Sequence, residues 1–138
     1  MPRRLTKVLL LTTFALTAGC GKNEYAVVPV AGVVTCQGKP VPYAVVTFNP
    51  ERGQRSDPTQ TGKASSSATD EEGRFNMSTY DYYDGALTGK HKVGIGLMMD
   101  PESMAARKRI GYGNDCPCAK DSKDVTITEA TSDLRLDF

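Results

Sequence analysis

Residues 30–49 have the sequence VAGVVTCQGKPVPYAVVTFN. Two apolar runs, 30–36 and 43–49, alternate with a period of two on either side of the turn sequence QGKP, residues 37–40. This period places every second side chain on the same face of a strand. The stretch therefore predicts two strands. Val30, Gly32, Val34 and Cys36 share the inward face of the first; in the second, Ala44, Val46 and Phe48 share one face, and Tyr43, Val45 and Thr47 share the other.

Alternating apolar residues recur in four later segments, which we also predict to be strands. Their inward-facing residues are Phe75, Met77, His91, Val93, Ile95, Leu97, Val125, Ile127, Leu134, Leu136 and Phe138. Short strands separated by turns rich in Gly, Pro and Asp are typical of an all-β sandwich, in which the apolar faces of two sheets pack together. We therefore expect an all-β fold.

Two segments depart from this alternation. Residues 50–67 are rich in polar and small residues and predict a long, mobile loop. Asp100 followed by Pro101 is a typical helix start, with Asp as the cap and Pro in the first helical position. We therefore expect a short helix at 101–110, within a long crossover between two late strands.

The N-terminus has the layout of a secretory signal. Three basic residues (Arg3, Arg4 and Lys7) precede an apolar run at residues 8–16, and two small residues stand directly before Cys20. Nine helical residues rise about 14 Å, well short of the roughly 20 residues that a membrane span needs. The segment therefore predicts a signal peptide rather than a transmembrane helix.

The run LTAGC, residues 16–20, resembles the lipobox of a bacterial lipoprotein precursor. This resemblance implies a lipoprotein signal peptide at 1–19, a covalent lipid on Cys20 and a tether that reaches residue 28. The alternative is an ordinary signal peptide followed by a cysteine by chance. Removal of residues 1–19 would leave 14 of the 17 basic residues against 16 acidic residues, a formal charge of −2. A chain without a basic excess gives no reason to expect nucleic-acid binding.

Further short segments follow one characteristic order: GVVT at 32–35, GKPV at 38–41, AVVTF at 44–48, TDEEGRF at 69–75, DGA at 84–86 and GKHKV at 89–93. This order resembles the carboxypeptidase regulatory-like, or transthyretin-like, domain of small planctomycete-type lipoproteins. The resemblance covers residues 29–99 and, more loosely, 125–138. It implies a seven-stranded, prealbumin-like sandwich with Ig-like Greek-key connections over residues 29–138, and a noncatalytic domain whose motif residues are structural.

Two features could be structural or functional. Asp70 can accept hydrogen bonds from the amides that follow it and close a turn that ends at Gly73. The competing interpretation is a Ca²⁺ site, but three adjacent acids cannot supply six to eight converging oxygens, so we predict no metal site. His91, the single histidine, is expected to be a hydrogen-bonded core residue, with a catalytic role as the alternative.

The three remaining cysteines allow several arrangements. Cys36 could pair with Cys116 or Cys118, which would close a loop of about 80 residues. Cys116 could instead pair with Cys118 across Pro117, in a strained bond that is easily reduced. Metal binding, free thiols and intermolecular pairing complete the alternatives. The basic run Arg107-Lys108-Arg109 is expected to be a solvated helix face, with contact to anionic lipid as the alternative.

These observations favour a noncatalytic, lipid-anchored envelope protein on a cell membrane or outer membrane, facing the periplasm or the exterior. It would be a structural unit or would bind an envelope protein or a glycan, with segments 50–67 and 100–124 carrying specificity. Apart from the lipid on Cys20, no cofactor is expected. The alternative function is a thiol-disulfide redox protein that exchanges disulfides through Cys116 and Cys118.

Overall fold

The computed structural model describes residues 24–138. The expected signal peptide at 1–19 and the expected lipidation site, Cys20, lie outside the described residues. Within the described range the chain forms ten strands and one helix, and three of the strands are only two residues long. The order is β1 (Val27–Val28), β2 (Val30–Cys36), β3 (Lys39–Pro40), β4 (Ala44–Pro50), β5 (Ser65–Ala68), β6 (Arg74–Asn76), β7 (Ala86–Leu87), β8 (Gly89–Leu97), α1 (Pro101–Arg109), β9 (Ser122–Ile127) and β10 (Thr131–Asp137).

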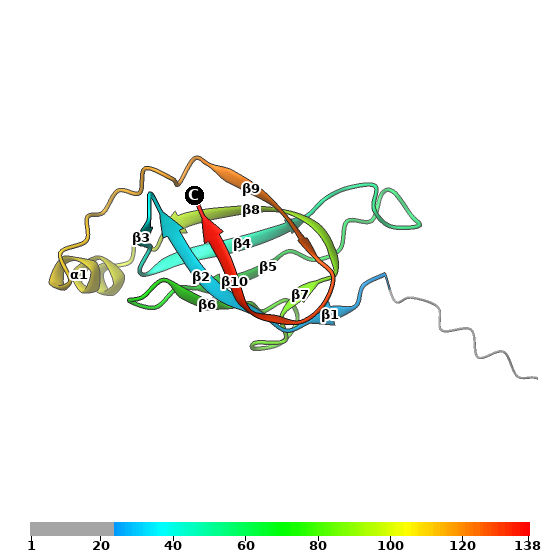
Figure 1. Ribbon diagram of the computed structural model, residues 1–138, viewed down its shortest axis with the longest axis horizontal. Helices are drawn as coiled ribbons and strands as arrows, with labels where there is room; N and C mark the ends of the chain where they lie inside the picture. Colours follow the sequence, from blue (N-terminus) through cyan, green and yellow to red (C-terminus); the bar gives the residue numbers. More distant parts are fainter. Residues whose placement is uncertain (1–23) are drawn as a thin grey trace, which may run out of the picture.

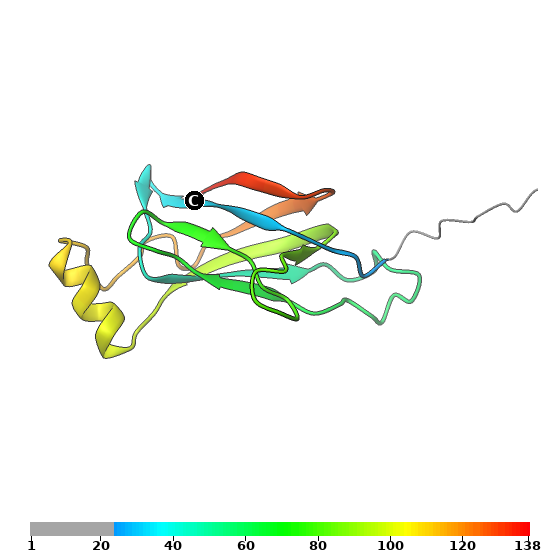
Figure 2. The same ribbon diagram turned by 90° about the horizontal axis from the view of Figure 1, so that it is seen from below.

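The strands form two principal sheets that face each other (Figures 1 and 2). One sheet has the order β10-β2-β3, and β6 also pairs with β2. The other has the order β5-β4-β8-β9, while β1 and β7 form a small two-stranded sheet. The expectation of an all-β fold built from packed sheets is confirmed at this level.

The core lies between the two sheets, and the inward-facing residues are the ones that alternation predicts. In β2 and β4 every second side chain is buried, from Val30 to Cys36 and from Ala44 to Phe48. Phe48 lies at the centre, with its ring 6.2 Å from that of Phe75. Each fully buried Val, Leu, Ile or Phe side chain contributes about 1.5–3 kcal/mol to stability, so burial of these alternating residues is the main favourable contribution to folding.

The last strand, β10, lies parallel to β2, with Leu134 opposite Gly32 and Leu136 opposite Val34. Their approach is close at Gly32, where a Cβ atom would stand 1.9 Å from the carbonyl oxygen of Leu134. A side chain at position 32 would therefore force the two strands apart. Gly32 allows β10 to complete the sheet.

Two predictions about segments have different outcomes. The helix is confirmed: α1 begins at Pro101, and Asp100 Oδ1 accepts a hydrogen bond of 2.9 Å from the Ser103 amide. The loop predicted at 50–67 is wrong at both ends: Pro50 is the last residue of β4, and β5 begins at Ser65 and pairs antiparallel with β4. Sequence patterning missed β5 because its residues, SSSA, include no β-branched or aromatic side chain.

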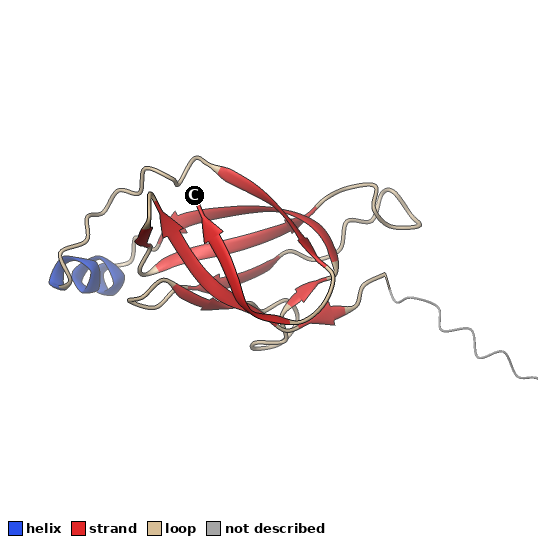
Figure 3. Cartoon of the chain, in the orientation of Figure 1, coloured by secondary structure: helices blue, strands red, loops and turns tan. Residues whose placement is uncertain are grey.

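Figure 3 shows α1 beyond one end of the sandwich, opposite the end at which the described chain begins. Over residues 24–138 no helix has the length and apolar character that a bilayer span requires.

Candidate functional site

The most distinctive surface feature is the segment between β6 and β7, residues 78–84, with the sequence STYDYYD. We refer to it as the tyrosine loop. The carboxylate of Asp84 organises it by accepting hydrogen bonds from three consecutive amides, those of Thr79 at 2.6 Å, Tyr80 at 2.9 Å and Asp81 at 3.1 Å. Partial burial raises the pKa of Asp84, but these amide hydrogen bonds outweigh it and hold the pKa below its ordinary value.

Other side chains complete the hydrogen bonding of the loop. The Tyr82 amide donates to Asp81 Oδ1 at 2.7 Å, and the Tyr83 amide donates to Ser78 Oγ at 2.9 Å. Tyr83 has a φ of 57°, which is uncommon for a residue with a large side chain. Every amide from residue 79 to residue 83 therefore has a side-chain acceptor, and the loop has one defined shape.

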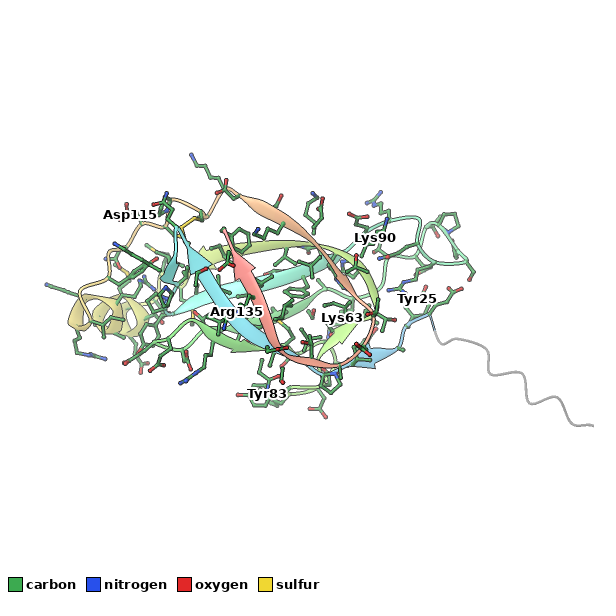
Figure 4. The ribbon with its side chains drawn as sticks, viewed as in Figure 1. Tyr25, Lys63, Tyr83, Lys90, Asp115 and Arg135 are labelled. Carbon is green, nitrogen blue, oxygen red and sulfur yellow. A yellow bond between two sulfur atoms is a disulfide. The ribbon has the colours of Figure 1, made fainter. Side chains whose placement is uncertain are left out.

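This loop presents three aromatic rings to solvent. Tyr80 is 60% exposed, Tyr82 88% and Tyr83 64%. The rings of Tyr82 and Tyr83 lie edge to face with centroids 6.4 Å apart, and Tyr83 projects from the side of the sandwich in Figure 4. Aromatic rings grouped on a surface loop are a common mark of a binding site, because their exposure has no benefit for folding.

A shallow pocket of about 350 Å³ lies beside these rings. The loop contributes Ser78, Thr79, Tyr80, Asp81 and Tyr82, and the segment leading into β5 contributes Lys63, Ala64 and Ser66. The ammonium group of Lys63 lies 5.1 Å from the centroid of the Tyr80 ring, within cation–π range. The lining thus combines two aromatic rings with hydroxyl, carboxylate and ammonium groups.

Sequence reasoning did not single out this site, which lies largely outside the two segments expected to carry specificity. A signal was present, since three of the six tyrosines fall within residues 80–83. Tyrosine also belongs in strands and cores, and only the structure distinguishes exposed rings from buried ones.

Two of the cysteines meet where the crossover that follows α1 is joined to β2. Cys36 in β2 is bonded to Cys118 in the segment between α1 and β9, and both side chains are nearly inaccessible, at 5% and 2% exposure. The sequence left several pairings open, and the structure has the one in which Cys36 pairs with Cys118 of the crossover. Cys116 is a free, half-buried thiol.

The pairing of Cys116 with Cys118 that the redox hypothesis requires is therefore not formed. Cys118 is bonded to Cys36 within the hydrophobic core, where an exchanging thiol would have poor access. Pro117 separates the two cysteines, and Cys118 lies on the core side while Cys116 packs only partly against it. The bond acts as a link between the crossover and β2.

The interpretation of Arg107-Lys108-Arg109 as a solvated helix face is wrong for Arg107. Its side chain is completely buried, while Lys108 and Arg109 are exposed. Arg107 Nη1 donates to the carbonyl oxygen of Tyr43 at 3.0 Å, and Nη2 donates to Asn114 Oδ1 at 3.2 Å. The guanidinium is buried because it reaches backbone and amide acceptors that a shorter cation could not bridge.

The prediction of a core histidine is confirmed. His91 is fully buried, and its Nε2 lies 2.7 Å from the carbonyl oxygen of Leu87, so Nε2 carries the proton and donates. Nδ1 is buried without a hydrogen-bond partner. Burial lowers the pKa of His91, because the protonated ring would lose its hydration in the core. The ring of Phe48 packs beside it, with centroids 5.7 Å apart.

Asp70 forms the predicted turn. Its Oδ1 accepts from the amides of Glu72 at 3.0 Å and Arg74 at 2.9 Å, and the Gly73 amide donates to its carbonyl oxygen at 3.1 Å. Oδ2 forms an ion pair of 2.8 Å with Arg74. The carboxylate is thus directed at its own turn, and within residues 24–138 no cluster of three or more His, Cys, Asp or Glu side chains could hold a metal ion.

The first described residues are held against the domain rather than extended from it. Arg55 Nη1 donates to the carbonyl oxygen of Glu24, and its guanidinium lies 5.2 Å from the centroid of the Tyr25 ring. The Ser56 amide and hydroxyl both donate to Glu24 Oε2 at 2.9 Å. Residues 24–28, which we expected within a tether, therefore pack on the sandwich, at the end marked by Tyr25 and Lys90 in Figure 4.

Comparison with protein-family models, with curated proteins and with solved structures finds no match to this chain.

Proposed function

We propose that this protein is a noncatalytic, lipid-anchored envelope protein that binds an envelope component through its tyrosine loop. The observation that carries the proposal is the loop itself, in which three exposed rings are held in one shape by hydrogen bonds to backbone amides. A preorganised aromatic surface binds a partner without a large loss of conformational entropy. The proposed fold is the prealbumin-like sandwich, which the two facing sheets support.

The proposed anchor is a lipid on Cys20, in the cell membrane or the outer membrane, with the domain facing the periplasm or the exterior. The hydrogen bonds from Arg55 and Ser56 to Glu24 support a short link between the lipid and the domain, because Cys20 and Glu24 are only four residues apart. Four residues span at most about 14 Å, so the loop that holds Glu24 would lie close to the bilayer surface. The end with α1 would then point away from the membrane (Figure 1).

The anchor is tested by the intact mass of the protein purified from membranes of the producing cells. We expect a mass that lacks residues 1–19 and includes acyl chains, and we expect Cys20→Ser to lose both the lipid and the membrane fraction. A mature protein that is membrane-bound without a lipid on Cys20 would contradict the anchor.

The binding role is tested separately, with the Cys20→Ser chain and washed cell envelopes. We expect retention of this chain on the envelopes, and we expect loss of retention when Tyr80→Ala and Tyr82→Ala are added. Ile110→Ala is the control: it removes an exposed apolar side chain at the end of α1 that lies outside both the tyrosine loop and the pocket lining. Equal retention of all variants, or of none, would contradict a role for the loop.

A further inference from the structure

We propose that the pocket beside the tyrosine loop binds a pyranose unit of a neutral glycan. This inference rests on the proposed function and specifies the chemical class of its partner. It identifies Tyr80 and Tyr82 as stacking residues, with Lys63 and Asp81 as the polar groups that orient the sugar.

The aromatic part of the lining fits one face of a sugar ring. A pyranose presents several C–H bonds on one face, and these pack against the electron-rich face of an aromatic ring. Tyr80 and Tyr82 both line the pocket and are 60% and 88% exposed, so a ligand can reach them. Tyrosine suits this role because it combines a rigid apolar ring with a polar hydroxyl.

The polar part of the lining fits the hydroxyl groups at the rim of the same sugar. Asp81 supplies acceptors, Lys63 supplies donors, and the hydroxyls of Ser66 and Ser78 can do either. A few convergent polar groups around an apolar surface are typical of small-ligand sites, and about 350 Å³ falls within the usual size range. One ammonium and one carboxylate leave the lining without net charge, which favours a neutral sugar.

The hydrogen bonds of the loop support a ligand that needs fixed geometry. Asp84 holds the amides of Thr79, Tyr80 and Asp81, so the backbone that carries both stacking rings is set before binding. The loop is also joined to β5, because Ser66 and Ser78 exchange two backbone hydrogen bonds of 3.0 Å. The two sides of the pocket, with Lys63 on one and Tyr80 on the other, are therefore fixed relative to each other.

A folded protein partner fits the pocket less well than a glycan does. A stable protein interface buries about 800 Å² on each partner around an apolar core. The pocket lining has no aliphatic side chain larger than that of Ala64. Its hydrophobic character comes from the tyrosine rings alone, which is the pattern that a sugar can use.

The direct test is a titration of the Cys20→Ser chain, followed by the shifts of its backbone amide signals in NMR spectra. The probes are chitohexaose, cellohexaose and mannohexaose, three neutral glycans with different hydroxyl arrangements. We expect at least one probe to shift the amides of residues 63–66 and 78–84. No shift with any of the three at millimolar concentration, or shifts confined to other residues, would overturn the proposal.

Variants then test which tyrosine rings contact the sugar. We expect Tyr80→Ala and Tyr82→Ala each to weaken binding of the active probe about threefold to tenfold, the range that one lost aromatic contact gives. Ile110→Ala, at the end of α1 and outside the pocket lining, should bind as the parent chain does. Unchanged amide signals outside the loop show that each variant is folded. Equal affinity of all the variants would overturn the stacking assignment.

Envelope retention separates failure of this inference from failure of the proposed function. If retention depends on Tyr80 and Tyr82 and survives protease treatment of the envelopes but not glycoside-hydrolase treatment, the partner is a glycan. If protease treatment abolishes retention, the glycan inference fails while the binding role of the loop stands. If neither tyrosine affects retention, the proposed function itself fails.

Discussion

Arg107 in the helix and Tyr43, the residue before β4, are joined by a hydrogen bond of 3.0 Å, from Nη1 to the backbone carbonyl oxygen. The same carbonyl accepts from the Met98 amide at 3.0 Å, at a residue whose φ is 50°. The buried side chains of α1 are only Ser103, Ala106 and Arg107. The orientation of the helix on the sandwich therefore depends on a buried cation rather than on an apolar face.

We expect Arg107→Met to lower the free energy of unfolding by about 1–2 kcal/mol, because Asn114 Oδ1 and one lone pair of the Tyr43 carbonyl would lose their donor. Denaturant unfolding measures this change. Lys108→Met is the matched control on the exposed side of the same turn, with an expected effect within about 0.5 kcal/mol. Equal stability of both variants would show that the guanidinium contributes nothing at this position.

The disulfide gives a second prediction. Cys36 and Cys118 are 82 residues apart in sequence, and a closed loop of this length stabilises the fold by about 4 kcal/mol in the chain-entropy description. We expect the double variant Cys36→Ala and Cys118→Ala to lose about 2–4 kcal/mol in denaturant unfolding, whereas Cys116→Ser should keep the stability of the parent chain. Peptide mapping without reduction should recover Cys36 linked to Cys118, and a peptide with Cys116 linked to Cys118 would contradict the pairing.

His91 predicts a dependence of stability on pH. Burial lowers its pKa, so in the unfolded chain it takes up a proton near pH 6.5, before the folded chain does. Between these two pKa values the unfolded state binds more protons, and stability falls as the pH falls. The expected slope is at most about 1.4 kcal/mol per pH unit below pH 6.5.

The variant His91→Gln tests this dependence, because it keeps a donor for the Leu87 carbonyl and does not titrate. We expect the free energies of unfolding of the two chains to converge between pH 7 and pH 5, because the parent chain loses stability that the variant does not lose. A parallel decline of both chains would place the titrating group elsewhere.

Asp84 should control the order of the tyrosine loop. Asp84→Ala removes the acceptor of three amides, so we expect faster hydrogen exchange at residues 79–81 and unchanged exchange in the strands. Asp115→Ala, in the crossover after α1 and well separated from Tyr83 in Figure 4, is the control.

Acid should lower the protection of the same amides in the parent chain, where protection is the exchange rate of an unstructured chain at that pH divided by the measured rate. The folded pKa of Asp84 is depressed, so its stabilising effect is complete above the ordinary aspartate pKa of about 3.9 and is lost as the pH falls further. Protection of these amides that is insensitive to both the substitution and acid would contradict the role of Asp84.

Alternation in the sequence predicted the strands that form the core because burial follows a strict period of two there, as in Val30 to Cys36. Alternation predicts on which face of its strand each side chain lies, but it does not predict which strands pair with each other. The parallel pairing of β10 with β2 depends on the close approach at Gly32, which the chain makes only after it has folded. β5 escaped prediction because pairing with β4, rather than its own propensity, makes it a strand.

The candidate site was harder to predict than the core. Arg107 resembles its exposed neighbours in sequence, and only the acceptors at Tyr43 and Asn114 explain its burial. The choice between Cys116 and Cys118 as partner of Cys36 depends on which side chain enters the core. Tyr80 and Tyr82 line one pocket because Asp84 and Ser66 fix the loop around them.

The hydrogen bonds from Arg55 and Ser56 to Glu24 have a mechanical consequence. Tension on the N-terminal end would first reach these side-chain contacts and the two residue pairs between β1 and β7, before it reached β2. Rupture of this short segment would release residues 24–28, a gain of about 17 Å, while both main sheets stayed intact. In a single-molecule pulling experiment, release of residues 24–28 should appear as a small extension before the main unfolding event. A trace without that step would mean that these contacts are too weak to resist the applied force separately.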